Sequence, residues 1–228
     1  MTAVKTALII GASRGLGLGL VKHLLEDGWQ VTATVRDPQK ADALLALPGV
    51  QIKTLDMNDR QQLDQLGVEL QDQVFDLLFV NAGIKGPAEQ DAEVARQQDI
   101  GELFMTNAIA PIRLAQRFAG QVRSDTGVIA FMSSVLGSIT IPDAPELALY
   151  KASKAALNSM TNTFATQLSD PSVTVLAMHP GWVKTDMGGE GADLDIDTST
   201  AGLVEQVKAY AGKGGLWFIN YKGDSLVW

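Results

Sequence analysis

The chain contains no cysteine and only two histidines, His23 and His179, among its 228 residues. Disulfides and thiolate metal sites are therefore excluded. The two histidines lie far apart in the sequence, and neither belongs to a His-x-x-x-His or clustered carboxylate pattern that would indicate a catalytic metal. We therefore expect no metal site and assign neither histidine a catalytic role.

Basic residues are also few, and long apolar runs are missing. The chain has 18 Lys and Arg against 26 Asp and Glu, a net charge of −8. This balance disfavours non-specific binding of nucleic acid, which needs a basic face. No apolar run reaches the roughly 18 residues that suggest a membrane span. The start of the chain lacks the pattern of a secretory signal, so we expect a cytoplasmic protein that binds neither nucleic acid nor membrane.

The residues that are present alternate between strand-like and helix-like patterns. Apolar residues make up 46% and charged residues 19% of the chain, as in ordinary globular proteins. Strands are expected at residues 4–10, 30–35, 50–55, 74–80, 128–132, 173–178 and 216–219. Helices are expected after Gly19 and at 41–47, 60–71, within 91–122 (as one helix or two, with Pro111 near a bend or restart), 147–168 and 199–211.

This alternation predicts an α/β fold of the Rossmann type. The simplest arrangement is a doubly wound, mostly parallel sheet of about seven strands with helices on both faces. No repeat or linker interrupts the pattern, so we expect residues 1–228 to form a single domain. Residues 181–200 hold few apolar side chains and many Gly and Asp, which predicts a loop or lid.

A glycine-rich stretch, with Gly11, Gly15 and Gly17, follows the first expected strand and opens the first helix. Glycines let a backbone turn tightly and approach a pyrophosphate, whose negative charge is favoured at a helix N-terminus. The spacing is G-x-x-x-G-x-G rather than G-x-G-x-x-G. A dinucleotide site is therefore favoured, with a generic tight turn or a Rossmann-type methyltransferase as the alternatives.

Tyr150 and Lys154 are four residues apart in an expected helix, so they lie one turn from each other on one face. An ammonium that close favours the phenolate, so we expect the pKa of Tyr150 to fall below its usual value of about 10. A tyrosine with a lowered pKa can donate or accept a proton near neutral pH. Taken alone, the pair equally describes a surface contact within a helix.

Six segments, in order, resemble motifs of the short-chain dehydrogenases/reductases. They are the Gly11/Gly15/Gly17 loop, Asn81-Ala82-Gly83, Asn107, Ser133–Gly137, the Tyr150/Lys154 pair and His179–Thr185. The resemblance runs from about residue 4 to 188 and is nearest to a branch of C-factor-like and sniffer-like carbonyl reductases. The chain departs from the family pattern at Ile10, where Thr is frequent, and at Val80, which replaces an Asn.

The resemblance implies a hydride transfer between a nicotinamide and a carbonyl or alcohol, with four catalytic residues. Tyr150 would exchange a proton with the substrate, and Lys154 would lower the pKa of Tyr150 and hold the nicotinamide ribose. Ser134 would stabilise charge on the substrate oxygen, and Asn107 would support a water chain. Ser133 is the rival of Ser134, because adjacent strand residues face opposite sides.

The end of the second strand indicates which cofactor is bound. By the family alignment, Val35 stands where NAD-binding members carry an acid, and Arg36 follows it. Arg36 and Arg14 together would clamp a 2′-phosphate, which predicts NADP. The alternative is that Asp37, after a slip of one residue, binds the ribose of NAD.

The remaining cofactor positions come from the same resemblance. Asp56 would bind adenine, unless it caps the helix near residues 59–60. Val183 and Thr185 would meet the nicotinamide carboxamide. The complete predicted cofactor set is Gly11, Ser13, Arg14, Gly15, Leu16, Gly17, Arg36, Asp56, Asn81, Ala82, Gly83, Tyr150, Lys154, Pro180, Gly181, Val183 and Thr185.

Three further features concern substrates and partners. The Ser134-to-Tyr150 connection is longer than is common in the family, which predicts a loop insertion at Ile139–Glu146, with Pro142 and Pro145. Trp182 and Met187 either wall the substrate pocket or simply pack, and the family favours a homodimer or homotetramer. A second function is left open, that of a dinucleotide-binding signalling or regulatory protein of the C-factor type.

Overall fold

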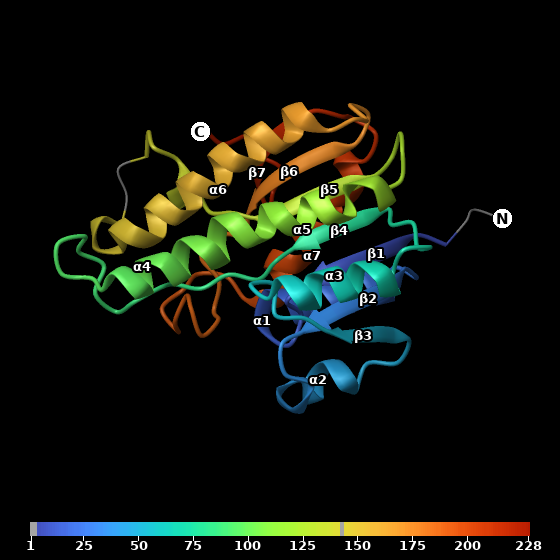
Figure 1. The fold of residues 1–228 in the computed structure, drawn as a ribbon, viewed down its shortest axis with the longest axis horizontal. Helices are drawn as coiled ribbons and strands as arrows, with labels where there is room; N and C mark the ends of the chain where they lie inside the picture. Colours follow the sequence, from blue (N-terminus) through green and yellow to red (C-terminus); the bar gives the residue numbers. More distant parts are fainter. Residues whose placement is uncertain (1–3, 142–143) are drawn as a thin grey trace.

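Seven parallel strands form one sheet in the computed structural model, which describes residues 4–141 and 144–228. The strand order is β3-β2-β1-β4-β5-β6-β7 (Figure 1). The strands are β1 (Thr6–Ile10), β2 (Gln30–Val35), β3 (Val50–Thr54), β4 (Leu77–Val80), β5 (Val128–Met132), β6 (Thr174–His179) and β7 (Leu216–Asn220). The predicted doubly wound sheet is confirmed, and every strand pair is parallel.

The sheet has one point where the direction of strand addition reverses. From β1 the chain builds β2 and β3 on one side, and it then returns to place β4 on the other side of β1. In open parallel sheets the crevice at such a switch point, beyond the carboxyl ends of the strands, is where ligands bind. The glycine-rich loop follows β1 and the Asn81-Ala82-Gly83 segment follows β4, so the topology brings both to this crevice.

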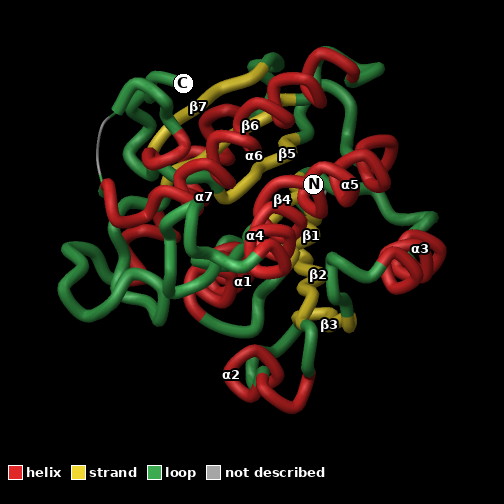
Figure 2. Tube along the Cα trace, turned by 60° about the vertical axis from the view of Figure 1, so that its left-hand side comes forward, coloured by secondary structure: helices red, strands yellow, loops and turns green. Residues whose placement is uncertain are grey.

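Helices cover both faces of the sheet (Figures 1 and 2), as predicted. They are α1 (Gly15–Glu26), α2 (Asp42–Leu45), α3 (Arg60–Glu69), α4 (Gln97–Phe104), α5 (Ala110–Phe118), α6 (Ala148–Gln167) and α7 (Ile196–Tyr210). One apolar core lies under α1, α2 and α7, and the other lies under α3, α5 and α6. Alternate residues of β1 serve the two cores, with Ala7 and Ile9 in the first and Leu8 and Ile10 in the second. Burial on both faces explains the continuous apolar character of the central strands.

The helical region predicted within 91–122 forms two helices, α4 and α5, and the second begins beside Pro111, as the sequence indicated. A π-helical turn, η2 (Met105–Ile109), joins α4 to α5, so the irregularity begins before Pro111, which lies in the first turn of α5. Asn107 sits within this turn. The restart near the proline is confirmed, but the sequence did not predict the π-helical turn that precedes it.

Two other boundaries differ from the predictions. The expected strand 74–80 is regular only over β4, because Phe75 forms an isolated bridge with Val122. The loop expected over 181–200 ends earlier, because Asp195 caps α7 by accepting a hydrogen bond from the Thr198 backbone N–H at 2.7 Å. Among the described residues, no helix is long and apolar enough to cross a membrane.

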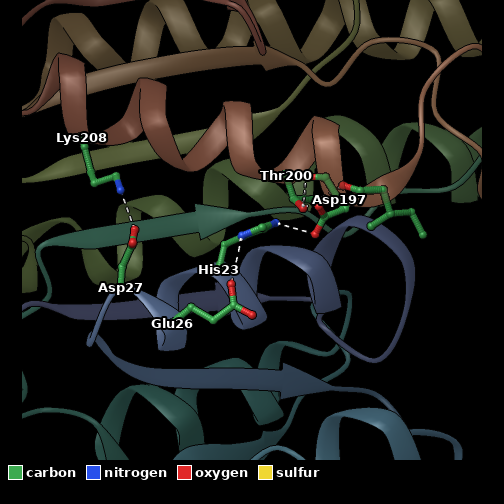
Figure 3. Close-up of polar contacts among 7 residues, drawn as sticks. His23, Glu26, Asp27, Asp197, Thr200 and Lys208 are labelled. Atoms are coloured by element: carbon green, nitrogen blue, oxygen red, sulfur yellow. Dashed lines mark hydrogen bonds and ion pairs between the residues drawn. The ribbon is translucent and has the colours of Figure 1, made fainter.

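Helix α1, whose N-terminus faces the crevice, is joined to α7 by polar contacts (Figure 3). The Lys208 ammonium lies 2.5 Å from the Asp27 carboxylate. The His23 ring lies between two carboxylates, with Nδ1 3.5 Å from Glu26 and Nε2 3.1 Å from Asp197. His23 thus connects the two helices at the protein surface and does not line the cavity at the crevice.

Candidate active site

A cavity of about 880 Å³ opens at the carboxyl ends of the strands. Most of the predicted cofactor residues line it, from the glycine-rich loop to the segment after β6. These are Gly11, Ser13, Arg14, Gly15, Leu16, Arg36, Asp56, Asn81, Ala82, Gly83, Tyr150, Lys154, Pro180 and Thr185. Gly17, Gly181 and Val183 are not on its wall. The structure therefore brings 14 of the 17 predicted residues together in one cavity.

Gly17 supports the glycine-rich loop from behind. A Cβ at Gly17 would lie 2.1 Å from the Gly11 carbonyl oxygen and 2.7 Å from the Asn81 amide nitrogen. That amide donates to the Gly11 carbonyl at 2.7 Å, which fixes the turn to the end of β4. Gly11 itself has φ +83°, and a Cβ there would meet the Ala82 side chain at 2.7 Å. The close contact of two backbone segments therefore requires glycine at both positions.

The Tyr150 phenol meets the Ser134 side chain by a hydrogen bond. Ser134 follows β5 and accepts a second hydrogen bond from the Leu136 backbone N–H at 3.1 Å. Ser133 points elsewhere, because its hydroxyl donates to the Asn158 side chain at 2.6 Å. The geometry therefore makes Ser134, not Ser133, the partner of Tyr150, although Ser133 forms part of the cavity wall and Ser134 does not.

The expected lowering of the Tyr150 pKa is wrong for this structure. Burial raises the pKa of Tyr150 to about 12, although the hydrogen bond from Ser134 lowers it. Burial also lowers the pKa of Lys154 to about 8. The Lys154 ammonium is 5.8 Å from the centre of the tyrosine ring, and it donates to the Met132 carbonyl oxygen at 2.8 Å. The effect of burial on the pKa of Tyr150 therefore outweighs that of the Ser134 hydrogen bond, and the phenol keeps its proton at neutral pH.

Asn107, at 1% exposure, braces the backbone around the site. Its side-chain oxygen accepts from the Ile84 N–H, and its amide donates to the Ile84 carbonyl, both at 2.8 Å. The same amide donates to the Ser153 hydroxyl at 3.0 Å, and that hydroxyl donates to the Tyr150 carbonyl at 2.7 Å. Sequence reasoning missed Ser153, although its position three residues after Tyr150 is the helical spacing that permits this contact. The water chain predicted for Asn107 stays a prediction.

Two arginines, Arg14 and Arg36, line the cavity. Arg36 follows β2 and is exposed, and Arg14 forms an ion pair with Asp186 from the loop after β6. Asp37 does not line the cavity. Its carboxylate accepts from the Gln39 backbone N–H at 3.0 Å, so it caps a short 3₁₀ turn. This position of Asp37 speaks against its use as an NAD-binding acid.

Asp56 lines the cavity at the end of β3. The alternative that it caps the following helix is wrong, because Asp59 is the N-cap of α3. The Asp59 carboxylate accepts from the Gln61 and Gln62 backbone N–H groups at 2.9 and 3.2 Å. The Asp56 carboxylate instead accepts from the Asn58 backbone N–H at 2.9 Å.

The loop between β6 and α7 is folded on itself at the cavity mouth. The Trp182 indole donates to the Gly188 carbonyl at 2.9 Å, and the Leu194 N–H donates to the Trp182 carbonyl at 3.1 Å. Met187 lines the cavity, whereas Trp182 does not. Of the longer connection before Tyr150, Pro145 begins a 3₁₀ turn, and Pro142 lies outside the described residues.

Known proteins match both the sequence and the fold. The model of the short chain dehydrogenase family matches residues 5–193. The C-signal of Myxococcus xanthus is 30% identical over 156 residues, which cover 67% of this chain and 92% of that protein. A carbonyl reductase from Pseudomonas aeruginosa PAO1, crystallised in complex with NADP, is 41% identical with a TM-score of 0.92, and the match covers 99% of this chain and 100% of that one. The carbonyl reductase Sniffer of D. melanogaster is 33% identical with a TM-score of 0.89, and the match covers 99% of this chain and 100% of that one.

Proposed function

Because the chain belongs to the short chain dehydrogenase family, we propose that it is an NADP(H)-dependent carbonyl reductase. The observation that carries this proposal is the Ser134–Tyr150 hydrogen bond beside Lys154 in the cavity, with Arg14 and Arg36 lining the same cavity. The similar carbonyl reductase from Pseudomonas aeruginosa PAO1, which has NADP bound, supports the same assignment.

The cavity residues fit a phosphorylated dinucleotide. Gly11 and Gly15 of the glycine-rich loop line the cavity without a side chain, and the loop leads into the N-terminus of α1, which favours a pyrophosphate. Arg14 and Arg36 would bind the 2′-phosphate through charge-assisted hydrogen bonds. Asp56 would bind the adenine, and Lys154 would hold the nicotinamide ribose. The remaining members of the predicted set that line the cavity would form the path between these two ends.

The protein groups would handle the proton and the developing charge. When bound, the cofactor supplies the hydride that adds to the carbonyl carbon. The electron pair of the carbonyl bond then moves to its oxygen, to which Tyr150 gives its proton. Ser134 would stabilise the negative charge on that oxygen by donating its hydroxyl hydrogen. The raised pKa of Tyr150 keeps the phenol protonated at neutral pH, which is the form that carbonyl reduction requires.

A panel of aldehydes and ketones tests this proposal. We expect at least one class of small or medium carbonyl compound to cause oxidation of NADPH. The oxidation is measured as the loss of NADPH absorbance at 340 nm. The control omits the carbonyl compound and measures background oxidation. Tight NADPH binding with no turnover across the whole panel would contradict the proposed activity.

The second candidate is a dinucleotide-binding signalling or regulatory protein. The similarity to the C-signal of Myxococcus xanthus favours it. The hydrogen bond between Tyr150 and Ser134, with Lys154 beside the tyrosine ring, favours the reductase, because a protein that only binds a dinucleotide has no need of a proton donor. The carbonyl panel separates the two candidates.

The proposal also covers location and assembly. We propose a cytoplasmic enzyme that consists of one domain and associates as a homodimer or homotetramer. Two tryptophans near the C-terminal end support association, because Trp217 and Trp228 are 38% and 42% exposed. Analytical ultracentrifugation measures the assembly, and a sedimentation coefficient of a monomer at micromolar concentration would contradict it.

A further inference from the structure

A buried glutamine, Gln90, contacts the start of the helix that carries Tyr150. The Gln90 side chain is 7% exposed and lies in the segment between β4 and α4. Its Oε1 accepts a hydrogen bond from the Tyr150 backbone N–H at 2.9 Å. Its Nε2 donates to the Pro87 carbonyl at 2.8 Å and to the Lys85 carbonyl at 3.3 Å. The amide thus uses its acceptor and its donors together, which fixes its orientation.

Gln90 provides a hydrogen-bond partner that the helix itself lacks. Tyr150 is the third residue of α6, and the first four N–H groups of a helix have no partner inside it. Leu147, at the N-cap position, makes no side-chain cap. A residue 60 positions earlier in the chain therefore takes the place of a local cap, at the turn that holds the proposed proton donor.

The carbonyl of Tyr150 is held from the same segment. Ser153 donates to the Tyr150 carbonyl at 2.7 Å and accepts from Asn107 at 3.0 Å. Asn107 in turn bonds both the N–H and the carbonyl of Ile84 at 2.8 Å. Both backbone groups of Tyr150 are therefore connected to residues 84–90. Ile84 lines the cavity, so this segment links the cavity wall to the tyrosine.

We propose that Gln90 is a positioning residue for carbonyl reduction, which fixes the backbone of Tyr150 so that its phenol meets Ser134 and the substrate oxygen. The proposal rests on the proposed function. A proton donor works only within roughly 2.6–3.2 Å of its acceptor. A displacement of about 1 Å at such a site can cost about 10²-fold in rate. Without the Gln90 contact, the first turn of α6 loses the partner of its third N–H group and frays more readily.

The variant Gln90→Met tests this role because it keeps the volume of the side chain and removes its hydrogen bonds. We expect kcat for carbonyl reduction to fall about tenfold or more, because the donor is displaced, while the Michaelis constant for NADPH changes less than about twofold. The matched control is Gln98→Met on α4, where the glutamine is exposed, and it should keep wild-type kinetics. A wild-type kcat in folded Gln90→Met would overturn the proposal.

Amide exchange provides a readout that does not depend on activity. The chain has only three tyrosines, so ¹⁵N-tyrosine labelling gives three backbone signals, from Tyr150, Tyr210 and Tyr221. In Gln90→Met we expect the Tyr150 amide to exchange about tenfold faster or more, because it loses its acceptor, and the other two to be unchanged. An unchanged exchange rate at Tyr150 would overturn the proposed contact. If the wild type reduces no carbonyl compound, the proposed function fails, and this measurement still decides the contact.

If Gln90→Met does not fold, Gln90→Glu replaces it in both assays. A carboxylate still accepts from the Tyr150 N–H but cannot donate to the carbonyls of Lys85 and Pro87. We expect a protected Tyr150 amide and a kcat within about threefold of wild type. A protected amide with a kcat lowered by about tenfold or more would overturn the proposal, because the Tyr150 contact would then be present without its effect.

Discussion

The surroundings of Tyr150 change the pKa of its phenol in opposite directions. Burial raises its pKa to about 12, while the Ser134 hydroxyl lowers it. Lys154 is 4% exposed, and its ammonium donates to the Met132 carbonyl. The four-residue spacing predicted that Tyr150 and Lys154 would lie close together, but it did not predict the direction in which the pKa of Tyr150 shifts. Spacing carries no information on how much water the folded chain removes from a group.

Arg36 gives a prediction at the scale of one side chain. Replacing it with alanine would remove the proposed charge-assisted contact to the 2′-phosphate, and a hydrogen bond to a charged group is worth about 1.5–3 kcal/mol. We therefore expect Arg36→Ala to raise the Michaelis constant for NADPH by about 10- to 100-fold and that for NADH by less than about twofold. Steady-state kinetics with both cofactors measure this, with Arg60→Ala on α3 as the control. An equal effect on both cofactors would refute a role in phosphate binding.

At the scale of elements, the π-helical turn between α4 and α5 decides where Asn107 points. The region 91–122 was predicted as helical with a bend near Pro111, and the structure confirms helices on both sides of the turn. A pattern of apolar residues does not reveal the one extra residue that a π turn inserts. The place of Asn107 was therefore predictable from the family resemblance, but its contacts with Ile84 and Ser153 were not.

The contact between α1 and α7 gives a prediction at this scale. A Cβ on Gly19 of α1 would lie 2.8 Å from Ile196 and 2.8 Å from the Thr200 hydroxyl of α7, so the helices would have to separate. We expect Gly19→Ala to lower the free energy of unfolding by about 1–3 kcal/mol, measured by urea denaturation.

The control substitution is Gly101→Ala in α4, where an added Cβ meets no atom within 4 Å. Alanine favours a helix interior over glycine by about 0.5–1 kcal/mol, so this variant should be as stable as wild type or more stable. Equal destabilisation of the two variants would show that packing against α7 is not the cause.

Over the whole molecule, the alternation of strands and helices was enough to predict the sheet. β2 and β5 have the predicted boundaries, and the other strands differ by a few residues. Contacts between loops that are distant in the sequence could not be predicted in this way, because no regular spacing of residues along the chain indicates them. Gln90 and Tyr150 are 60 residues apart, and only the packing of the segment after β4 against α6 brings them together. The folding of the loop after β6, with the Arg14–Asp186 ion pair, is a similar case.

His179 makes the stability of the whole molecule depend on pH. Burial lowers its pKa from 6.5 to about 4, and its Nδ1 is buried with no hydrogen-bond partner among the described residues. Between these two values the unfolded chain takes up a proton that the folded protein does not, so the free energy of unfolding falls as the pH falls from about 6.5 to about 4. We expect His179→Gln to reduce that loss by roughly 2–3 kcal/mol.

Urea denaturation of the wild type and of His179→Gln, at about pH 7 and about pH 4, measures the difference. The free energies of unfolding of the two proteins should differ little at neutral pH. The decrease between about pH 7 and about pH 4 should be larger for the wild type than for His179→Gln. The same loss of stability on acidification in both proteins would show that other groups dominate.

The most direct test of the central claim is the kinetics of Tyr150→Phe, which removes the phenol hydroxyl and keeps the ring. A carbonyl compound that the wild type reduces is used, and NADPH binding is measured separately by fluorescence titration. We expect the dissociation constant for NADPH to stay within about threefold of wild type and kcat to fall by about 10²-fold or more, because general acid catalysis contributes about 10²- to 10⁴-fold. A kcat that stays within about tenfold of the wild type, with cofactor binding intact, would contradict the role of Tyr150 as the proton donor.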